Sequence, residues 1–497
     1  MLLMPPSANP ERVRGAVAAF VAGALPALAF PAPAWWFVAW FGVVPLLWLV
    51  RTAPGPGDGA ARGWLGATAF VLTTQYWLAG SAGLLLPVLA AGLGALWLPW
   101  GWLAHRLLAA PVGGGRATVA LVALPSAWVA AEVARSWPPL GGSWAPLGAS
   151  QASQPVTLAS ASLGGVWLTS FLVVAANTAL AGLLAGGGRL GALMCLAMSV
   201  AVGPLWYLLG PDPGAGPVLR VALVQPGDIA DSDARQGAGE LWTATLVGRR
   251  PDLVVWGESS VGQDLDSHPE ALARLVELSR RVGADVLVNV DARAPDGRIR
   301  KSSVLIGPDG LAGSYQKTRL VPFGEYVPLR PLFGWVTRGS KAAAEDRQPG
   351  AGPVVLRAGA LPIGALISYE AVFPDLARRE AQLGAALLAY QSSTSSFQGS
   401  WAQPQLAAQP AVRAVEAGRP AVHAGLSGDS SAFDARGHRL AWCPAGFRGA
   451  VVVDVPLGST TTWYQRLGDW VPVVAFAVLG AAVVRWRRPA GGDTLPG

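Results

Sequence analysis

One amine, two carboxylates and a small hydroxyl stand where they could perform acyl transfer. Lys317 and Glu325 lie close together in the stiff, aromatic segment 315–328. Glu258 follows the apolar run 252–257, and Ser368 follows the apolar run 363–367. In acyl transfer a carboxylate takes the proton of the nucleophile, an ammonium stabilises the oxyanion, and the nucleophile carries the acyl group. Glu258, Lys317 and Ser368 make a set suited to that chemistry.

Lys317 stands out because this chain otherwise uses arginine. Of 37 basic residues only Lys301, Lys317 and Lys341 are lysines. Arginine cannot replace a compact ammonium that must approach a developing oxyanion. The alternative for Lys317 is a solvated loop lysine. The alternative for Ser368 is a small residue that closes a strand-to-helix turn.

The three side chains fall at or near the ends of strands in a predicted α/β layered domain. After the Pro/Gly linker 211–217, short apolar runs alternate with helical stretches as far as residue 456. Strand ends of open α/β sheets converge on one rim, so we expect the three groups to share a pocket. The predicted strands are 218–225, 252–256, 285–290, 303–306, 353–356, 363–367, 385–390, 421–424 and 451–455, the helices 270–282, 374–383 and 405–417, and the hairpin turns 307–310 and 434–437.

Much of the remaining chain avoids water. Charged residues make up 13% of the sequence, about half the usual globular share. Hydrophobic stretches of about 17 to 25 residues, each able to cross a hydrocarbon core about 30 Å thick, crowd residues 1–210. We predict a membrane domain over 1–210 and a last transmembrane helix within 468–486. The predicted spans are 13–32, 35–50, 63–77, 82–103, 117–134, 156–184, 190–209 and 471–484.

Basic residues in the short loops predict the orientation of these spans. With eight spans, one face carries Arg12, Arg14, Arg51, Arg62, Arg106, Arg116, Arg189, Arg485, Arg487 and Arg488, and the other carries Arg135 in its short loops. The positive-inside rule then puts both termini in the cytoplasm and the α/β domain outside. This topology accounts for the net charge of +7, so no nucleic-acid partner is predicted.

Cysteine and histidine usage argues against a disulfide framework or a metal centre. The two cysteines are Cys195, within a predicted span, and Cys443, in a turn. The four histidines are scattered without metal-ligand spacing. We expect no metal and no cofactor.

The chain resembles the apolipoprotein N-acyltransferases, membrane enzymes that carry a nitrilase-superfamily domain. The resemblance covers nearly the whole chain and includes a multi-span bundle, a closing span and the segments 141–151, 221–225, 256–258, 317–328, 368–370 and 413–420. It implies a nitrilase-like αββα sandwich for residues 218–456. It also implies a catalytic triad at Glu258, Lys317 and position 368, with Glu325 and Glu370 in supporting roles.

The same resemblance implies an activity and a location. A fatty acyl chain would pass from a membrane phospholipid to an acyl-enzyme, and then to the N-terminal amine of the diacylglyceryl-cysteine of apolipoproteins. The protein would lie in the bacterial cell membrane. Such a donor cannot leave the bilayer cheaply, because each buried CH₂ is worth about 0.8 kcal/mol. The pocket should therefore open towards the membrane.

Apolar and aromatic residues beside the triad are candidates for lining that pocket. Tyr369 belongs to the pocket by its position next to Ser368. Trp256, Phe323, Tyr326 and Phe373 are candidates for guiding the acyl chain, and ordinary core packing is the alternative for each.

The sequence departs from the family pattern at the nucleophile. Ser368 stands where the family has cysteine, Gly257 replaces the usual proline, Ser302 replaces a common asparagine, and 391–397 replaces an asparagine-containing stretch. A free cysteine is a few per cent thiolate near neutral pH, whereas a serine hydroxyl is not appreciably ionised and needs more help from a base.

Three hypotheses follow. The first is an N-acyltransferase that uses Ser368, or an engineered Cys-to-Ser form of a cysteine enzyme. The second is an inactive homologue that binds lipid or lipoprotein through the same pocket. The third, a transporter with an accessory domain, is disfavoured because the spans hold few ionisable residues, chiefly Glu132.

The topology can be tested by cysteine-accessibility labelling. Single cysteines placed at Asp296 and at Gly57 should label from opposite sides of the membrane, because the basic loops lie on the face opposite the α/β domain. Labelling of both sites from the same side would refute this arrangement.

Overall fold

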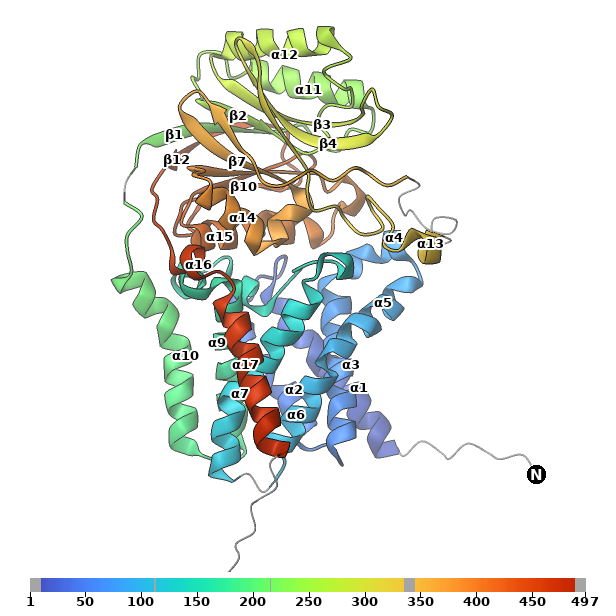
Figure 1. The fold of residues 1–497 in the computed structure, drawn as a ribbon, viewed down its shortest axis with the longest axis vertical. Coiled ribbons are helices and arrows are strands. Elements are labelled where there is room, and N and C mark those ends of the chain that lie inside the picture. The colour runs from blue at the N-terminus through green and yellow to red at the C-terminus, as the bar shows by residue number, and fades with distance from the viewer. Residues whose placement is uncertain (1–9, 111–112, 215, 335–344, 488–497) are drawn as a thin grey trace, which may run out of the picture.

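The computed structural model describes residues 10–110, 113–214, 216–334 and 345–487 (Figure 1). Lys341 and Arg488 lie outside the described residues. A bundle of helices forms one half of the molecule, and a sheet-rich domain stands on one end of it.

Among the described residues between 10 and 209, the secondary structure is helical. Its α-helices are α1 (Pro10–Ala24), α2 (Val44–Arg51), α3 (Pro56–Thr74), α4 (Ala79–Ala82), α5 (Leu85–Gly94), α6 (Leu98–Leu108), α7 (Gly114–Arg135), α8 (Pro155–Leu158), α9 (Ala161–Leu184) and α10 (Arg189–Leu209). Within the described residues, five helical stretches are long and apolar enough to cross a membrane: 10–29, 85–108, 114–135, 161–184 and 189–209.

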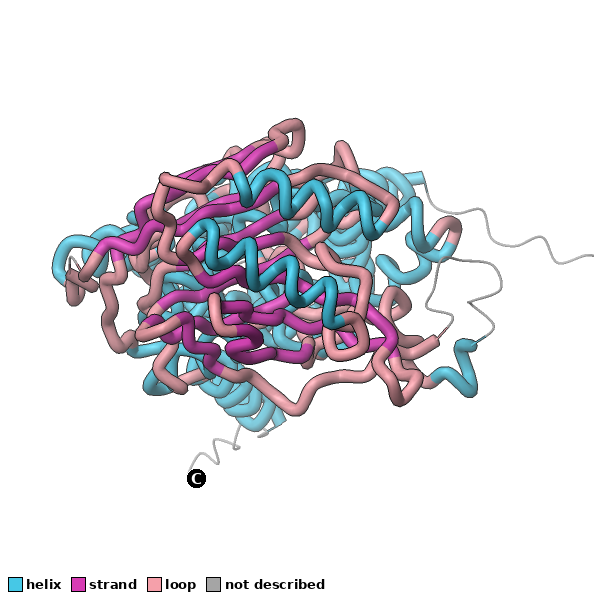
Figure 2. Tube along the Cα trace, turned by 90° about the horizontal axis from the view of Figure 1, so that it is seen from above, coloured by secondary structure: helices cyan, strands magenta, loops and turns pink. Residues whose placement is uncertain are grey.

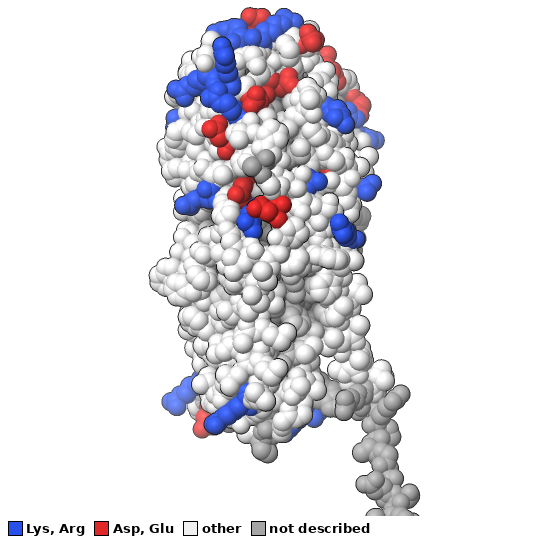
Figure 3. Space-filling view, turned by 90° about the vertical axis from the view of Figure 1, so that its left-hand side faces the viewer, with Lys and Arg blue, Asp and Glu red and all other residues white. Residues whose placement is uncertain are grey.

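The other three predicted spans correspond to shorter or less apolar helices. Residues 36–51 and 470–484 form apolar helices below full spanning length. The predicted span 63–77 falls on α3, whose first turns carry Asp58 and Arg62 and so lower its hydropathy. The count of eight spans stays a prediction. Figure 3 shows charged side chains gathered on the sheet-rich domain and at the far end of the bundle, with an uncharged surface between them.

The second half of the chain alternates strands and helices. Its strands are β1 (Val218–Gln225), β2 (Leu253–Trp256), β3 (Asp285–Arg293), β4 (Ile299–Gly307), β5 (Gly310–Gln316), β6 (Val355–Ala358), β7 (Leu361–Ile367), β8 (Leu387–Ser392), β9 (Ala421–Gly425), β10 (Ser430–Phe433), β11 (Arg439–Cys443) and β12 (Gly449–Pro456). Its α-helices are α11 (Ser232–Ala244), α12 (Pro269–Val282), α13 (Arg330–Phe333), α14 (Pro374–Gln382), α15 (Ala402–Ala417), α16 (Trp463–Leu467) and α17 (Trp470–Arg487).

These strands form two six-stranded sheets stacked face to face. One has the order β12-β1-β2-β3-β4-β5 and the other β11-β10-β9-β8-β7-β6. Helices α11 and α12 cover the outer face of the first sheet, as Figure 2 shows from above, and α14 and α15 lie between the second sheet and the bundle. The predicted αββα sandwich is confirmed.

Sequence reasoning missed β5, β10 and β11, and two of these three lack a strong apolar pattern. β10 begins with two serines, and β5 is short on large apolar side chains. Helix α11 was also missed, because its sequence is polar and contains glycines. Both predicted hairpin turns are present, joining β4 to β5 and β10 to β11.

A break in α9 joins the bundle to the α/β domain. Gly164 and Gly165 leave helical geometry, with φ of +69° at Gly165, where a Cβ would lie 2.7 Å from the ring of Tyr464. The break frees the amide of Val166, which donates to Glu416 Oε1 of α15 at 2.6 Å. One hydrophobic core runs from the bundle helices into the second sheet. The two halves therefore form one packed unit.

Glu380 of α14 generates a prediction about pH and stability. Its side chain is fully buried against Gly364 of β7. Burial raises the pKa of Glu380 from an ordinary 4.5 to about 8, and the nearby carboxyl of Glu370 adds to the rise. Between these values the folded state holds more protons than the unfolded state. The free energy of unfolding should therefore fall with rising pH, by at most about 1.4 kcal/mol per pH unit.

Glu380→Gln should remove this contribution. The melting temperature of the purified protein, followed by tryptophan fluorescence, should be higher in the variant than in the parent at high pH, with a difference that shrinks as the pH falls. A constant offset between the two curves would mean that the folded protein does not hold this proton.

Candidate active site

Glu258 lies where the two sheets meet. It follows β2 by two residues, and its amide donates to Ser392 O of the facing sheet at 3.1 Å. In return the amide of Ser393 donates to Glu258 Oε2 at 2.8 Å. A Cβ at Gly257 would lie 2.3 Å from Leu426 N, which explains a glycine there. The carboxylate is thus fixed by backbone contacts with the strand end of β8.

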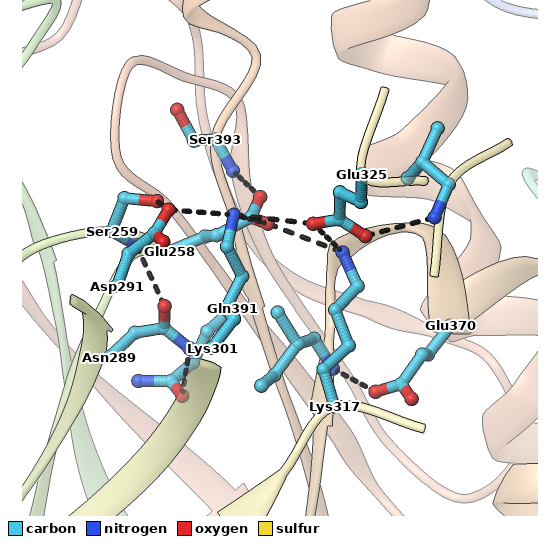
Figure 4. Close-up of polar contacts among 12 residues, drawn as sticks. Glu258, Ser259, Asn289, Asp291, Lys301, Lys317, Glu325, Glu370, Gln391 and Ser393 are labelled. Atoms are coloured by element: carbon cyan, nitrogen blue, oxygen red, sulfur yellow. Dashed lines mark hydrogen bonds and ion pairs between the residues drawn. The ribbon is translucent and has the colours of Figure 1, made fainter. Parts of the chain in front are cut away.

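Lys317 enters the site directly after β5. Its amide donates to Lys301 O at 2.9 Å, and its side chain is 1% exposed. Lys317 Nζ lies 2.9 Å from Glu325 Oε1 and 3.5 Å from Glu258 Oε1 (Figure 4). Glu325 Oε2 accepts the amide of Val321 at 2.9 Å. The burial of the Lys317 side chain excludes the alternative of a solvated loop lysine.

A second lysine that sequence reasoning gave no role lies in the same cluster. Lys301 of β4 is 7% exposed, and its Nζ lies 2.7 Å from Glu258 Oε1, 3.2 Å from Asp291 Oδ2 and 3.5 Å from Glu325 Oε1. Asp291 is its partner across the antiparallel pair of β3 and β4. The available signal was its residue type, since lysine is rare in this chain.

These charges hold one another ionised. Burial raises the pKa of Glu258, but Lys301 and Lys317 outweigh burial and bring the pKa below its ordinary value. The same competition between burial and the two lysines lowers the pKa of Glu325 to about 2. For Asp291 the cations are Lys301 and Arg347, and they lower its pKa to about 2. Burial lowers the pKa of Lys301, and the three carboxylates reverse this and raise it. The site therefore presents ionised carboxylates at neutral pH.

Ser368 lies on the same rim, in a strained turn. It begins the 3₁₀ turn Ser368–Val372 after β7 and has φ of +53°, a left-handed value that costs a non-glycine residue about 1 to 3 kcal/mol. Ile367 pairs with Gln391 in the parallel β7–β8 register, which places Ser368 beside Ser392. Among the described residues, no hydrogen bond joins the Ser368 hydroxyl to Glu258 or Lys317.

Glu370 connects the Ser368 turn to the Lys317 segment. Its Oε2 accepts the amide of Ile367 at 2.8 Å. Its Oε1 accepts the amides of Thr318 at 2.8 Å and Arg319 at 2.9 Å, and the hydroxyl of Tyr315 at 2.7 Å. One carboxylate therefore fixes the residues that flank both proposed catalytic positions.

Four of the aromatic candidates lie near the turn after β7 or in the Lys317 segment, and Trp256 lies elsewhere. Tyr369 packs edge-on against Phe373 with ring centroids 5.0 Å apart, and a Cβ at Gly142 of the bundle would lie within 2.7 Å of both side chains. Phe323 and Tyr326 are half-buried in the Lys317 segment. Trp256 instead lies in the core on the α11 and α12 side of the first sheet, where Nε1 donates to Thr243 Oγ1 at 2.8 Å. This position favours the core-packing alternative for Trp256.

Aromatic contacts bring the bundle against the loop that follows β8. The ring of Trp77 lies 4.8 Å from that of Trp144 and 4.7 Å from that of Phe397. Tyr76 meets Trp401 edge-on at 5.6 Å. Since Ser393 of the same loop binds Glu258, the site lies next to the junction with the bundle. Within the described residues, no cluster of histidine, cysteine, aspartate and glutamate is arranged to hold a metal ion.

Comparison with known proteins decides the family. Residues 22–179 match the model of the apolipoprotein N-acyltransferase N-terminal domain, and residues 220–465 match that of the carbon-nitrogen hydrolases. An apolipoprotein N-acyltransferase of Pseudomonas aeruginosa is 30% identical over 96% of this chain and 97% of its own length. The chain belongs to the apolipoprotein N-acyltransferase family.

Other members of the family match over similar lengths. The apolipoprotein N-acyltransferase of Rhizobium meliloti is 32% identical, with 88% of this chain and 89% of that protein covered. The one of Geobacter metallireducens is 29% identical, with 94% and 95% covered. The matches include both the helical half and the sandwich, as the sequence resemblance implies.

In this apolipoprotein N-acyltransferase family member, Glu370→Gln should loosen the Lys317 segment. Glutamine has one acceptor oxygen where glutamate has two. Its NH₂ group would therefore either face the Ile367 amide or replace the oxygen that accepts from Thr318 and Arg319. Each lost bond to a carboxylate is worth about 1.5 to 3 kcal/mol. Hydrogen exchange of peptides covering 315–321 should speed up by about 10- to 100-fold.

The matched control is Asp375→Asn. It removes a half-exposed carboxylate that binds Arg319 Nη2 at 2.7 Å, in the same region of the structure. Equal exchange in the two variants would contradict the role given to Glu370.

Proposed function

We propose that this protein is an apolipoprotein N-acyltransferase that uses Ser368 as nucleophile. Phospholipid is the acyl donor, and the amino group of a diacylglyceryl-cysteine is the acceptor. The observation that carries the proposal is the buried array of Glu258, Lys317 and Glu325 beside the strained Ser368 turn. Family membership supports the same activity.

In the first half-reaction Glu258 takes the Ser368 proton while Oγ attacks the donor's ester carbonyl. The Oγ–C bond forms, and Lys317 stabilises the oxyanion. The ester C–O bond then breaks, and the proton held by Glu258 passes to the leaving lysophospholipid oxygen. The product is an acyl ester on Ser368.

In the second half-reaction the acceptor amine attacks the acyl ester. The N–C bond forms, Glu258 takes a proton from the nitrogen, and the C–Oγ bond breaks as that proton returns to Ser368. The sum is one phospholipid ester and one amine converted to an amide and a lysophospholipid. No group beyond the donor, the acceptor and these side chains is needed.

The position of the site supports lipid as donor. Tyr369 and Phe373 contact Gly142 of the bundle, and the loop after β8 packs on Trp77 and Trp144. An acyl chain could reach the rim from the bilayer without crossing bulk water, which would cost about 0.8 kcal/mol per exposed CH₂. The predicted topology, with both termini cytoplasmic and the sandwich outside, is part of this proposal.

The deciding experiment follows acyl-enzyme formation and acyl transfer separately. Incubation with phospholipid should give an acyl adduct on Ser368 in the intact mass, and addition of a diacylglyceryl peptide should remove it. Ser368→Ala should abolish the adduct and lower transfer on the order of 10⁶-fold. An unchanged rate in that variant would exclude Ser368 as nucleophile.

Ser368→Cys should raise turnover, mainly in the second half-reaction. A thiolate forms more readily than an alkoxide and leaves more readily when the amine attacks. Equal or slower turnover would mean that the site is adapted to serine. No acyl adduct in either form would favour the lipid-binding homologue.

A further inference from the structure

Two lysines and two glutamates form a closed ring of alternating charge. Glu258 Oε1 lies 2.7 Å from Lys301 Nζ and 3.5 Å from Lys317 Nζ. Glu325 Oε1 lies 2.9 Å from Lys317 Nζ and 3.5 Å from Lys301 Nζ. Figure 4 shows both ammonium groups between the two carboxylates. Each ammonium therefore bridges the same pair of oxygens.

The shorter contact of Glu258 is with Lys301, the lysine outside the proposed triad. Lys317 is instead drawn towards Glu325. Without Lys301, Glu258 and Glu325 would share a single ammonium. Two buried carboxylates that share one cation cannot both stay ionised easily, and one of them takes up a proton at higher pH.

We propose that Lys301 is a positioning residue, which keeps Glu258 ionised and oriented so that Ser368 can be activated at lower pH than Lys317 alone would allow. The inference rests on the proposed function for the identity of base and nucleophile. Lys301 occupies Oε1 of Glu258, while the Ser393 amide holds Oε2 at 2.8 Å. Oε2 keeps a second lone pair that can accept the serine proton.

The remaining charged groups around Glu258 do not replace Lys301. Arg347 also attracts Glu258 and Glu325, but its ion pair is with Asp291 of β3, and the cations that chiefly lower the pKa of Glu258 are Lys301 and Lys317. Glu258 also acts on His423 of β9 and favours its charged form, but burial outweighs this and lowers the pKa of His423 to about 4, so the imidazole is neutral in the working range. Lys317 and Glu325, both from the segment after β5, complete the set. Lys301 is thus the cation that lets both glutamates stay charged.

The test compares Lys301→Met with Arg300→Met. Both remove one positive charge from adjacent residues of β4, but Arg300 is partly exposed and binds Asp296 and Gln348 outside the ring. The readout is the rate at which a fluorophosphonate modifies Ser368, followed by intact mass across a range of pH. This rate reports activation of the nucleophile without requiring a lipoprotein acceptor.

In Lys301→Met the acid limb of the profile should move up by about 1 to 3 pH units, because removal of an opposite charge within ion-pair distance shifts a carboxylate by that amount. Arg300→Met should keep the parent limb. Lys301→Arg retains the charge, so its acid limb should lie close to that of the parent. If Lys301→Met is not recovered folded, Lys301→Gln gives the same comparison.

The outcomes separate this inference from the proposed function. An unshifted acid limb in Lys301→Met, whatever its plateau, overturns the role of Lys301. No modification of Ser368 in the parent overturns both the inference and the serine mechanism. Modification with the expected shift, but no acyl transfer to a diacylglyceryl peptide, leaves Lys301 in its role and refutes the proposed function.

Discussion

The structure depends on keeping several buried charges paired at one rim of the sandwich. Moving an ion out of water costs several kcal/mol even after relaxation, and removal of one partner of a buried pair is strongly destabilising. The charges come from separate elements, Glu258 from the end of β2, Lys301 from β4 and Lys317 from the segment after β5. Strand register is therefore fixed by electrostatics as well as by the core, since a one-residue slip of β4 would turn Lys301 to the other face.

The same rim is held by backbone contacts between the two sheets. Ser392 and Ser393 exchange hydrogen bonds with Glu258, and the side chain of Gln391 donates to Trp256 O and Leu287 O at 3.0 Å. Strained backbone gathers here as well, at Ser259, Phe323 and Ser368. A frame of paired charges and backbone hydrogen bonds thus supports a few unfavourable conformations, which is common where chemistry is performed.

The sequence was informative where a signal was local. Apolar runs bounded by turn residues located most strands, and the rarity of lysine marked Lys317. It was weaker where tertiary contacts decide. β10 and α11 have little apolar patterning of their own, and α3 carries charges in its first turns. The role of Lys301 was missed because it depends on contacts with Asp291 across the strand pair and with two glutamates distant in sequence.

The broken helix α9 also bears on how such a protein could have been assembled. At the break, Val166 gives its amide to Glu416 of the sandwich, and Trp144 donates to Gln405 of the same helix α15 at 2.9 Å. A sandwich cut from the bundle at 211–217 would expose an apolar face and leave Glu416 without this donor. The two halves are therefore not interchangeable modules. Substitutions in the membrane helices and in α15 must be mutually compatible, so each half constrains the evolution of the other.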